Sequence, residues 1–87
     1  MADLRARFAS RAGADRTALL DALERQDQEQ LRERAHRLAG SAATFGYPEI
    51  GTAAFALQAA VDGGVSESEL SSAAQHLADQ LGAIADH

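Results

Sequence analysis

His36 is the side chain of this sequence that is best placed to act as a nucleophile. Arg32 stands four residues before it and Gly40 four residues after it, so on a helix the three would share one line of the surface. Ala43 extends this line by another turn. A neutral imidazole can attack an electrophile through a ring nitrogen, and neighbours with almost no side chain leave room for a large partner. The spacing therefore indicates an accessible imidazole on a helix, although by spacing alone a lone histidine in such a place is most often an ordinary surface residue.

Gly40 has two interpretations at this stage. A glycine inside a helix costs roughly 0.8–1 kcal/mol relative to alanine, so some other interaction should offset the loss. The glycine either lets a partner approach the imidazole of His36 or marks a close contact between two helices.

No second catalytic set stands out in the sequence. The chain has no cysteine, which excludes a disulfide framework and a thiol nucleophile. His76 has Ser72 and Gln80 four residues away on either side, a setting typical of a solvated histidine. The third histidine is the C-terminal His87. The three show no metal-ligand spacing, so we expect no metal site. No nucleophile–base–acid set supports a hydrolytic enzyme.

Residues 28–45 are predicted to form the helix that carries His36. Asp27 is a good N-cap residue, and Gly46 can adopt the left-handed conformation that ends many helices. Apolar residues recur at intervals of three and four, which is the pattern of one buried face: Leu31, Ala35, Leu38, Ala42 and Phe45. His36 lies one position off this face, so we expect its side chain to be exposed.

Similar signals place the other helices. Gly13 is expected to close a short first helix, and Asp15 to cap the second. Pro48 suits the first position of a helix, where its missing amide hydrogen is harmless. Ser66 with Glu69 three residues later predicts a capping box. The expected helices span residues 2–13, 15–25, 28–45, 48–62 and 67–85.

The fold class follows from these helices and their short connections. No sustained period-two alternation predicts a strand, and short connections favour antiparallel neighbours. We therefore expect an all-α, up-down antiparallel four-helix bundle, with the short N-terminal helix covering one end. The 87 residues should form a single domain, residues 1–87. Its core should be small because alanine dominates the apolar residues, and Phe45 and Phe55 are assigned to the core or its edge.

The stretch around His36 resembles a known family. His36-Arg37-Leu38-Ala39-Gly40-Ser41 is similar to the H-x-L-K-G-S signature of histidine phosphotransfer (HPt) domains, helical bundles that shuttle phosphoryl groups between receiver domains in phosphorelays. Thr44-Phe45-Gly46-Tyr47 resembles the corresponding stretch of the chemotaxis histidine kinases. The resemblance extends to residues 19–27 and 50–60, and so covers roughly the middle half of the chain.

This resemblance implies that His36 accepts a phosphoryl group from a receiver-domain aspartyl phosphate, or from a histidine kinase system, and passes it to a response-regulator aspartate. The protein would be a carrier and not a turnover enzyme. It would need no cofactor of its own, because the receiver holds the Mg²⁺. The implied partners are response-regulator receiver domains and a hybrid histidine kinase. Around His36, Gly40 and Ala43 would give access, and Arg32 and Arg37 would attract the phosphoryl group.

Three further positions near His36 carry expectations. The usual lysine of the family is replaced by Ala39, which puts stabilisation of the phosphorylated form in doubt. A glutamate that orients the histidine ring in the chemotaxis kinases corresponds to Gln58, whose amide oxygen could accept the same hydrogen bond without a full charge. Ser41 would either bond to a backbone carbonyl one turn earlier or contact phosphate. A second interpretation of the whole chain is a non-phosphorylated docking or dimerisation module that binds a receiver or kinase.

The charges and hydropathy bear on location and partners. The net charge of −5 argues against non-specific nucleic-acid binding. All eight Arg lie within residues 1–37, whereas residues 38–87 hold no Arg or Lys, so the cations could steer an acidic receiver toward His36. Alternatively they are ordinary helix charges, with Glu33 pairing with Arg37 and Glu29 with Arg32.

The apolar runs are short. None approaches the roughly 20 residues that span a bilayer, and the N-terminus lacks the layout of a signal peptide. We expect a cytoplasmic monomer that does not contact a membrane, either free-standing or part of a larger signalling protein.

Overall fold

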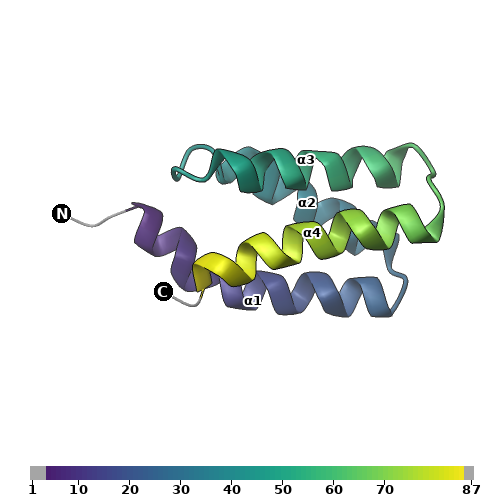
Figure 1. Ribbon diagram of the computed structural model, residues 1–87, viewed down its shortest axis with the longest axis horizontal. Helices are drawn as coiled ribbons and strands as arrows, with labels where there is room; N and C mark the ends of the chain where they lie inside the picture. Colours follow the sequence, from purple (N-terminus) through teal and green to yellow (C-terminus); the bar gives the residue numbers. More distant parts are fainter. Residues whose placement is uncertain (1–3, 86–87) are drawn as a thin grey trace.

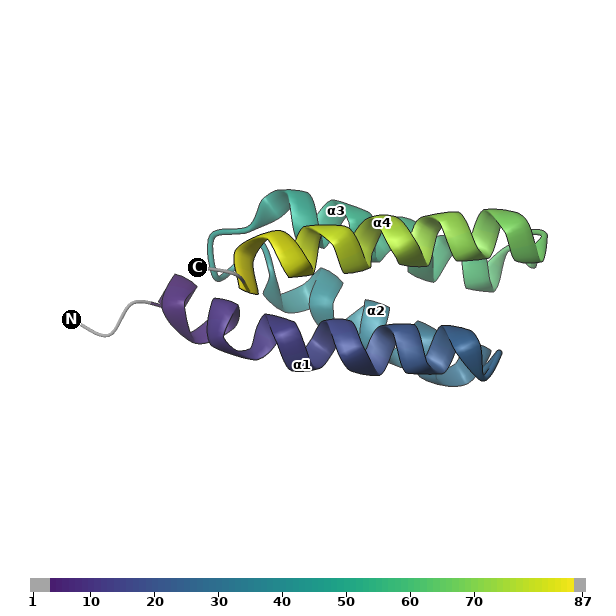
Figure 2. The same ribbon diagram turned by 60° about the horizontal axis from the view of Figure 1, so that its bottom comes forward.

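The computed structural model describes residues 4–85, which form four helices and no strand. These are α1 (Leu4–Glu24), α2 (Gln28–Ser41), α3 (Pro48–Asp62) and α4 (Glu67–Ala85). They lie along one another in an elongated bundle of 43 × 19 × 17 Å (Figure 1). Successive helices run antiparallel; α2 packs mainly against α3, and α1 mainly against α4 (Figure 2). The predicted all-α, up-down four-helix bundle is confirmed.

The first helix differs from the prediction. α1 is continuous from Leu4 to Glu24, so the expected division into helices 2–13 and 15–25 is wrong, and residues 2 and 3 lie outside the described residues. Gly13 lies within the helix because a single glycine costs only about 1 kcal/mol. The hydroxyl of Thr17 donates to the Gly13 carbonyl at 3.1 Å, and Asp15 is an interior residue and not a cap.

The N-terminal half of α1 nevertheless covers one end of the bundle. The Phe8 ring is buried and stacks against Phe45 and Tyr47, with ring centroids 5.8 and 5.3 Å apart. Both partners belong to the segment that follows α2. Phe45 is half-buried, as expected for the edge of the core, and this aromatic cluster holds the end of α2 against α1.

α2 ends earlier than predicted. It extends to Ser41, not to residue 45, and residues 42–46 form turns. Gly46 has a φ of 94°, the left-handed conformation that was expected there. The Tyr47 amide donates a hydrogen bond to the Ala42 carbonyl at 2.8 Å. This bond gives a partner to one of the carbonyls left unpaired where the helix ends. His36 therefore lies in the middle of a helix of 14 residues.

The remaining boundaries agree with the sequence signals. α3 and α4 span the residues predicted for them, and Pro48 is the first residue of α3. The Asp27 carboxylate accepts a bond from the Gln30 amide at 3.1 Å. The Ser66 hydroxyl accepts from the Glu69 amide at 3.2 Å. Each of these two caps is worth about 1 kcal/mol.

The core consists of leucine, isoleucine and alanine from all four helices, closed at one end by Phe8. The largest fully buried side chains are Leu19, Leu31, Leu57, Leu77 and Leu81. Phe55 was expected in the core or at its edge, but 66% of its surface is exposed. Phe55 lies off the face of α3 that buries Ile50, Ala54 and Leu57, so its ring is turned away from the core. Within residues 4–85, no helix is both long and apolar enough to cross a membrane.

Candidate functional site

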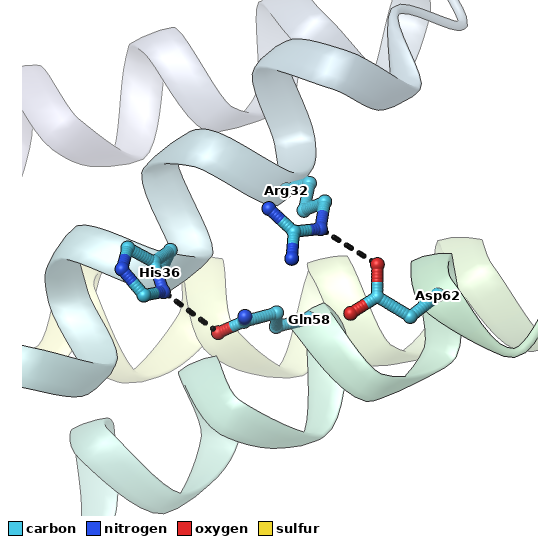
Figure 3. Close-up of polar contacts among 4 residues, drawn as sticks. All are labelled: Arg32, His36, Gln58 and Asp62. Carbon is cyan, nitrogen blue, oxygen red and sulfur yellow. Dashed lines mark hydrogen bonds and ion pairs between the residues drawn. The ribbon is translucent and has the colours of Figure 1, made fainter.

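His36 is exposed on α2, as predicted, and its ring is held from α3. Its Nδ1 lies 3.4 Å from Oε1 of Gln58 (Figure 3). Because an amide oxygen only accepts hydrogen bonds, Nδ1 must be the protonated nitrogen when this bond forms. The lone pair of the neutral ring then lies on Nε2, on the ring edge away from Gln58 (Figure 3). The expected contact between His36 and Gln58 is confirmed, and it points a nucleophilic nitrogen toward solvent.

Gly40 lies in open space one turn after His36. A Cβ atom added there would meet nothing within 4 Å. The interpretation of Gly40 as a close helix–helix contact is therefore wrong, and the interpretation as an open approach agrees with the structure. Ala43, in the turns that follow α2, is also exposed. Neither of these two positions carries a side chain larger than a methyl group.

A different glycine, Gly51 of α3, lies at the contact between α3 and α2, and sequence reasoning did not single it out. Gly51 is buried, and its Cβ position lies 3.6 Å from the Ala43 nitrogen and 3.7 Å from the Ala39 oxygen. The signal was a glycine within the apolar face of residues 48–62. Two turns further along α3, Gln58 reaches His36 across the same pair of helices.

Arg32 is paired differently from the prediction. The interpretation of the arginines as ordinary helix charges paired it with Glu29, but its Nε lies 2.6 Å from Oδ1 of Asp62 on α3 (Figure 3). Hydrogen bonding to Asp62 and its negative charge raise the pKa of Arg32 above its ordinary value. Both side chains are about half exposed (49% each), so solvent screens the pair and it contributes little stability. Its place matters more, because it lies one turn before His36.

Arg37 and Ser41 are engaged within α2. The Arg37 guanidinium donates to Glu33 at 2.8 Å, the expected pair four residues apart. The Ser41 hydroxyl donates to the Arg37 carbonyl at 2.9 Å, which agrees with the local-bond alternative for this serine. Ala39 is half-buried against α3. The cation whose pairing spans α2 and α3 beside His36 is therefore Arg32, not Arg37.

Phe55 is a second feature of the site that sequence reasoning missed. It precedes Gln58 by three residues and Asp62 by seven, and both of those residues reach α2, so helical spacing puts Phe55 on the same side of α3. His36, Gly40, Ala43 and Phe55 are all exposed. We refer to these four residues as the acceptor face. It combines a nucleophile, two neighbouring positions with small side chains and an exposed aromatic ring.

The other histidines are not part of this site. His76 is exposed on α4, as predicted, and His87 lies outside the described residues. Among residues 4–85, no group of three His, Cys, Asp or Glu side chains could hold a metal ion.

Comparison with known proteins identifies a family for this chain. Residues 3–87 match the family model described as Hpt domain, so the match covers almost the whole chain and not only the middle half that carried the resemblance. Searches of the curated proteins and of the solved structures give no match.

Proposed function

Because this chain belongs to the family of Hpt domains, which implies a histidine phosphotransfer role in two-component signalling, we propose that His36 is its phospho-acceptor. The observation that carries the proposal is the state of the ring. Nδ1 is oriented by Gln58, and Nε2 has no hydrogen-bond partner among the described residues. No other described histidine combines an oriented ring with an open approach.

The proposed transfer is a displacement at phosphorus. The Nε2 lone pair attacks the phosphorus of a receiver aspartyl phosphate, the N–P bond forms, and the P–O bond to the aspartate breaks. The carboxylate leaves with the electron pair of that bond. The ring then carries the phosphoryl group on Nε2 and a proton on Nδ1, so it is cationic. The Gln58 carbonyl accepts a bond from that proton and stabilises the cation.

The reverse reaction passes the group to a response-regulator aspartate. This chain contributes the oriented nucleophile and open space around it. The receiver would hold Mg²⁺ and stabilise the charge on the transferring oxygens. The protein thus acts as a carrier that is regenerated by each partner in turn.

Label transfer tests the proposal directly. The purified protein is mixed with a receiver domain phosphorylated with labelled phosphate in the presence of Mg²⁺. We expect label to move to this chain and to be acid-labile and alkali-stable, as a phosphoramidate is. Stable complex formation without label would instead identify a non-phosphorylated docking module, the second interpretation of this fold.

Phe55 is proposed as the apolar anchor of the receiver on the acceptor face. An exposed ring beside a clearing is typical of an interface residue. Phe55→Ala should raise the concentration of receiver needed for half-maximal transfer by about 5–30-fold, equivalent to about 1–2 kcal/mol for an aromatic interface residue. Because the ring is exposed, the melting temperature should stay unchanged. Transfer kinetics over a range of receiver concentrations measure this effect, and a variant with normal kinetics would remove Phe55 from the interface.

Arg32 is proposed to stabilise the phosphorylated ring in place of the missing lysine at Ala39. A phosphoryl group brings close to two negative charges to a position one turn from the guanidinium. It would compete with Asp62 for Arg32. Two unit charges about 4 Å apart interact by roughly 1 kcal/mol in water, so the competition should change the equilibrium by a few-fold.

Asp62→Asn should therefore shift the equilibrium toward the phosphorylated protein by a few-fold, and Arg32→Ala should shift it toward the phosphorylated receiver. Both shifts should shrink at high salt, because exposed charges are screened within about 8–10 Å. The measurement is the ratio of labelled carrier to labelled receiver at equilibrium. Asp21→Asn is the matched control, since Asp21 pairs with Arg25 at the C-terminal end of α1 and not with Arg32. If the ratio of labelled carrier to labelled receiver is the same in all three variants as in the wild type, Arg32 does not stabilise the phosphorylated ring.

A further inference from the structure

A second candidate site lies between α1 and α2. A pocket of about 390 Å³ opens there, lined by four arginines: Arg7 and Arg11 from α1, and Arg34 and Arg37 from α2. Phe8, Leu38 and Phe45 contribute an apolar wall. The pocket is lined from α2 by positions 34, 37, 38 and 41 and from the segment after α2 by Phe45, whereas His36, Gly40 and Ala43 are not in its lining. The pocket is therefore distinct from the acceptor face.

The charge of this pocket is unusual for the chain. Half of the eight arginines gather around it, in a protein of net charge −5. Arg37 pairs with Glu33, but the guanidinium groups of Arg7, Arg11 and Arg34 make no ion pair or hydrogen bond with any described residue. Asp15 is the one carboxylate in the lining, and it is not ion-paired with any of them. Like charges that line one pocket repel one another, and a bound anion would relieve this repulsion.

The volume and the lining residues of the pocket indicate which class of anion would fit it. The volume lies within the range of small-ligand pockets, roughly 300–1,000 Å³. Guanidinium groups bind phosphate oxygens through paired, charge-assisted hydrogen bonds. The apolar wall with Phe45 at its edge suits a flat ring, and a guanidinium can also stack on such a ring. An inorganic anion or an acidic peptide would leave that wall without a partner.

We propose that this pocket binds a nucleoside polyphosphate, with the phosphates among the arginines and the base against the apolar wall. This proposal goes beyond the phosphotransfer function and does not depend on it, since binding requires neither His36 nor a receiver.

Titration of the isotopically labelled full-length protein with magnesium-free ATP, followed by NMR, tests the proposal. We expect saturable shifts of the backbone amides of Ser10, Arg11, Arg34 and Ser41, and none around Gln75 on the exposed face of α4. Adenosine and tripolyphosphate are the comparison probes. Each should bind more weakly than ATP, because each lacks one of the two groups that the pocket recognises.

Arg7→Ala and Arg34→Ala should each weaken ATP binding by about tenfold, as expected for the loss of one charge-assisted hydrogen bond. Arg25→Ala is the matched control, because Arg25 is exposed and pairs with Asp21 away from the pocket. Circular dichroism checks that all three variants fold. Binding that does not saturate at millimolar ATP, or that is unaffected by both pocket variants, would overturn the proposal. Tripolyphosphate or polyglutamate binding as tightly as ATP would overturn the assignment of a nucleotide.

Discussion

His36→Gln should abolish phosphoryl uptake from a phosphorylated receiver while leaving the fold intact. Glutamine has no nucleophilic nitrogen, because the lone pair of an amide nitrogen is delocalised into its carbonyl. The side chain is exposed, and its described hydrogen bond to Gln58 is long, at 3.4 Å. Since surface substitutions away from special features usually change stability by less than about 0.5 kcal/mol, helicity and melting temperature should be nearly unchanged. Gel-based label transfer and thermal melting measure the two effects.

His76→Gln is the control for this experiment. It removes a second exposed histidine, on α4, and should transfer at the normal rate. If the His36 variant still takes up acid-labile label and the His76 variant does not, the acceptor lies on α4 and our assignment fails. If neither variant takes up label, His76 also contributes, and a site consisting of His36 alone is excluded.

A matched pair of glycine variants should separate access from packing. In Gly40→Leu, the new side chain enters open space, and leucine favours the helix by up to about 1 kcal/mol. The variant should be at least as stable as the wild type, but transfer should slow by about tenfold or more, because the leucine stands where the receiver must approach. Label transfer at fixed receiver concentration measures the loss.

In Gly51→Leu, the opposite result is expected. Gly51 is buried, with backbone atoms of Ala43 and Ala39 at 3.6 and 3.7 Å from its Cβ position, so the longer side chain of a leucine would be overpacked. Overpacking of this kind typically costs 1–3 kcal/mol, and in a domain of this size each kcal/mol lowers the melting temperature by about 4–8 °C. Thermal melting measures the loss. A destabilised Gly40 variant together with a stable Gly51 variant would reverse the roles that we assign to the two glycines.

The site histidine and its helix could be predicted from sequence because the signals are local. The N-cap at Asp27, the apolar spacing and the left-handed Gly46 depend on residues within a few positions of one another. They therefore placed His36 one position off the buried face of a helix. The line of Arg32, Gly40 and Ala43 follows from helical geometry in the same way. The resemblance supplied the role of Gln58, and the structure agrees with that contact.

Local signals also misled where tertiary packing outweighed them. Gly13 and Asp15 resemble a helix end followed by a cap, but α1 continues through both. The cost of one interior glycine is about 1 kcal/mol, which packing of Phe8 and Ala12 into the core easily offsets, since both side chains are buried. The C-terminal end of α2 was also predicted wrongly. The helix ends four residues before the predicted residue 45, and Phe45, in the turn that follows, stacks on Phe8.

The sequence by itself determined the helical content, the bundle and an exposed histidine next to small side chains. Each of these depends on spacing along one segment. Only the tertiary structure decided which side chains from different helices meet. It paired Arg32 with Asp62, packed Gly51 against α2, exposed Phe55 and gathered four arginines between α1 and α2. Such contacts depend on the rotation and separation of packed helices, and helix rotation is set by the whole core at once rather than by any one stretch of sequence.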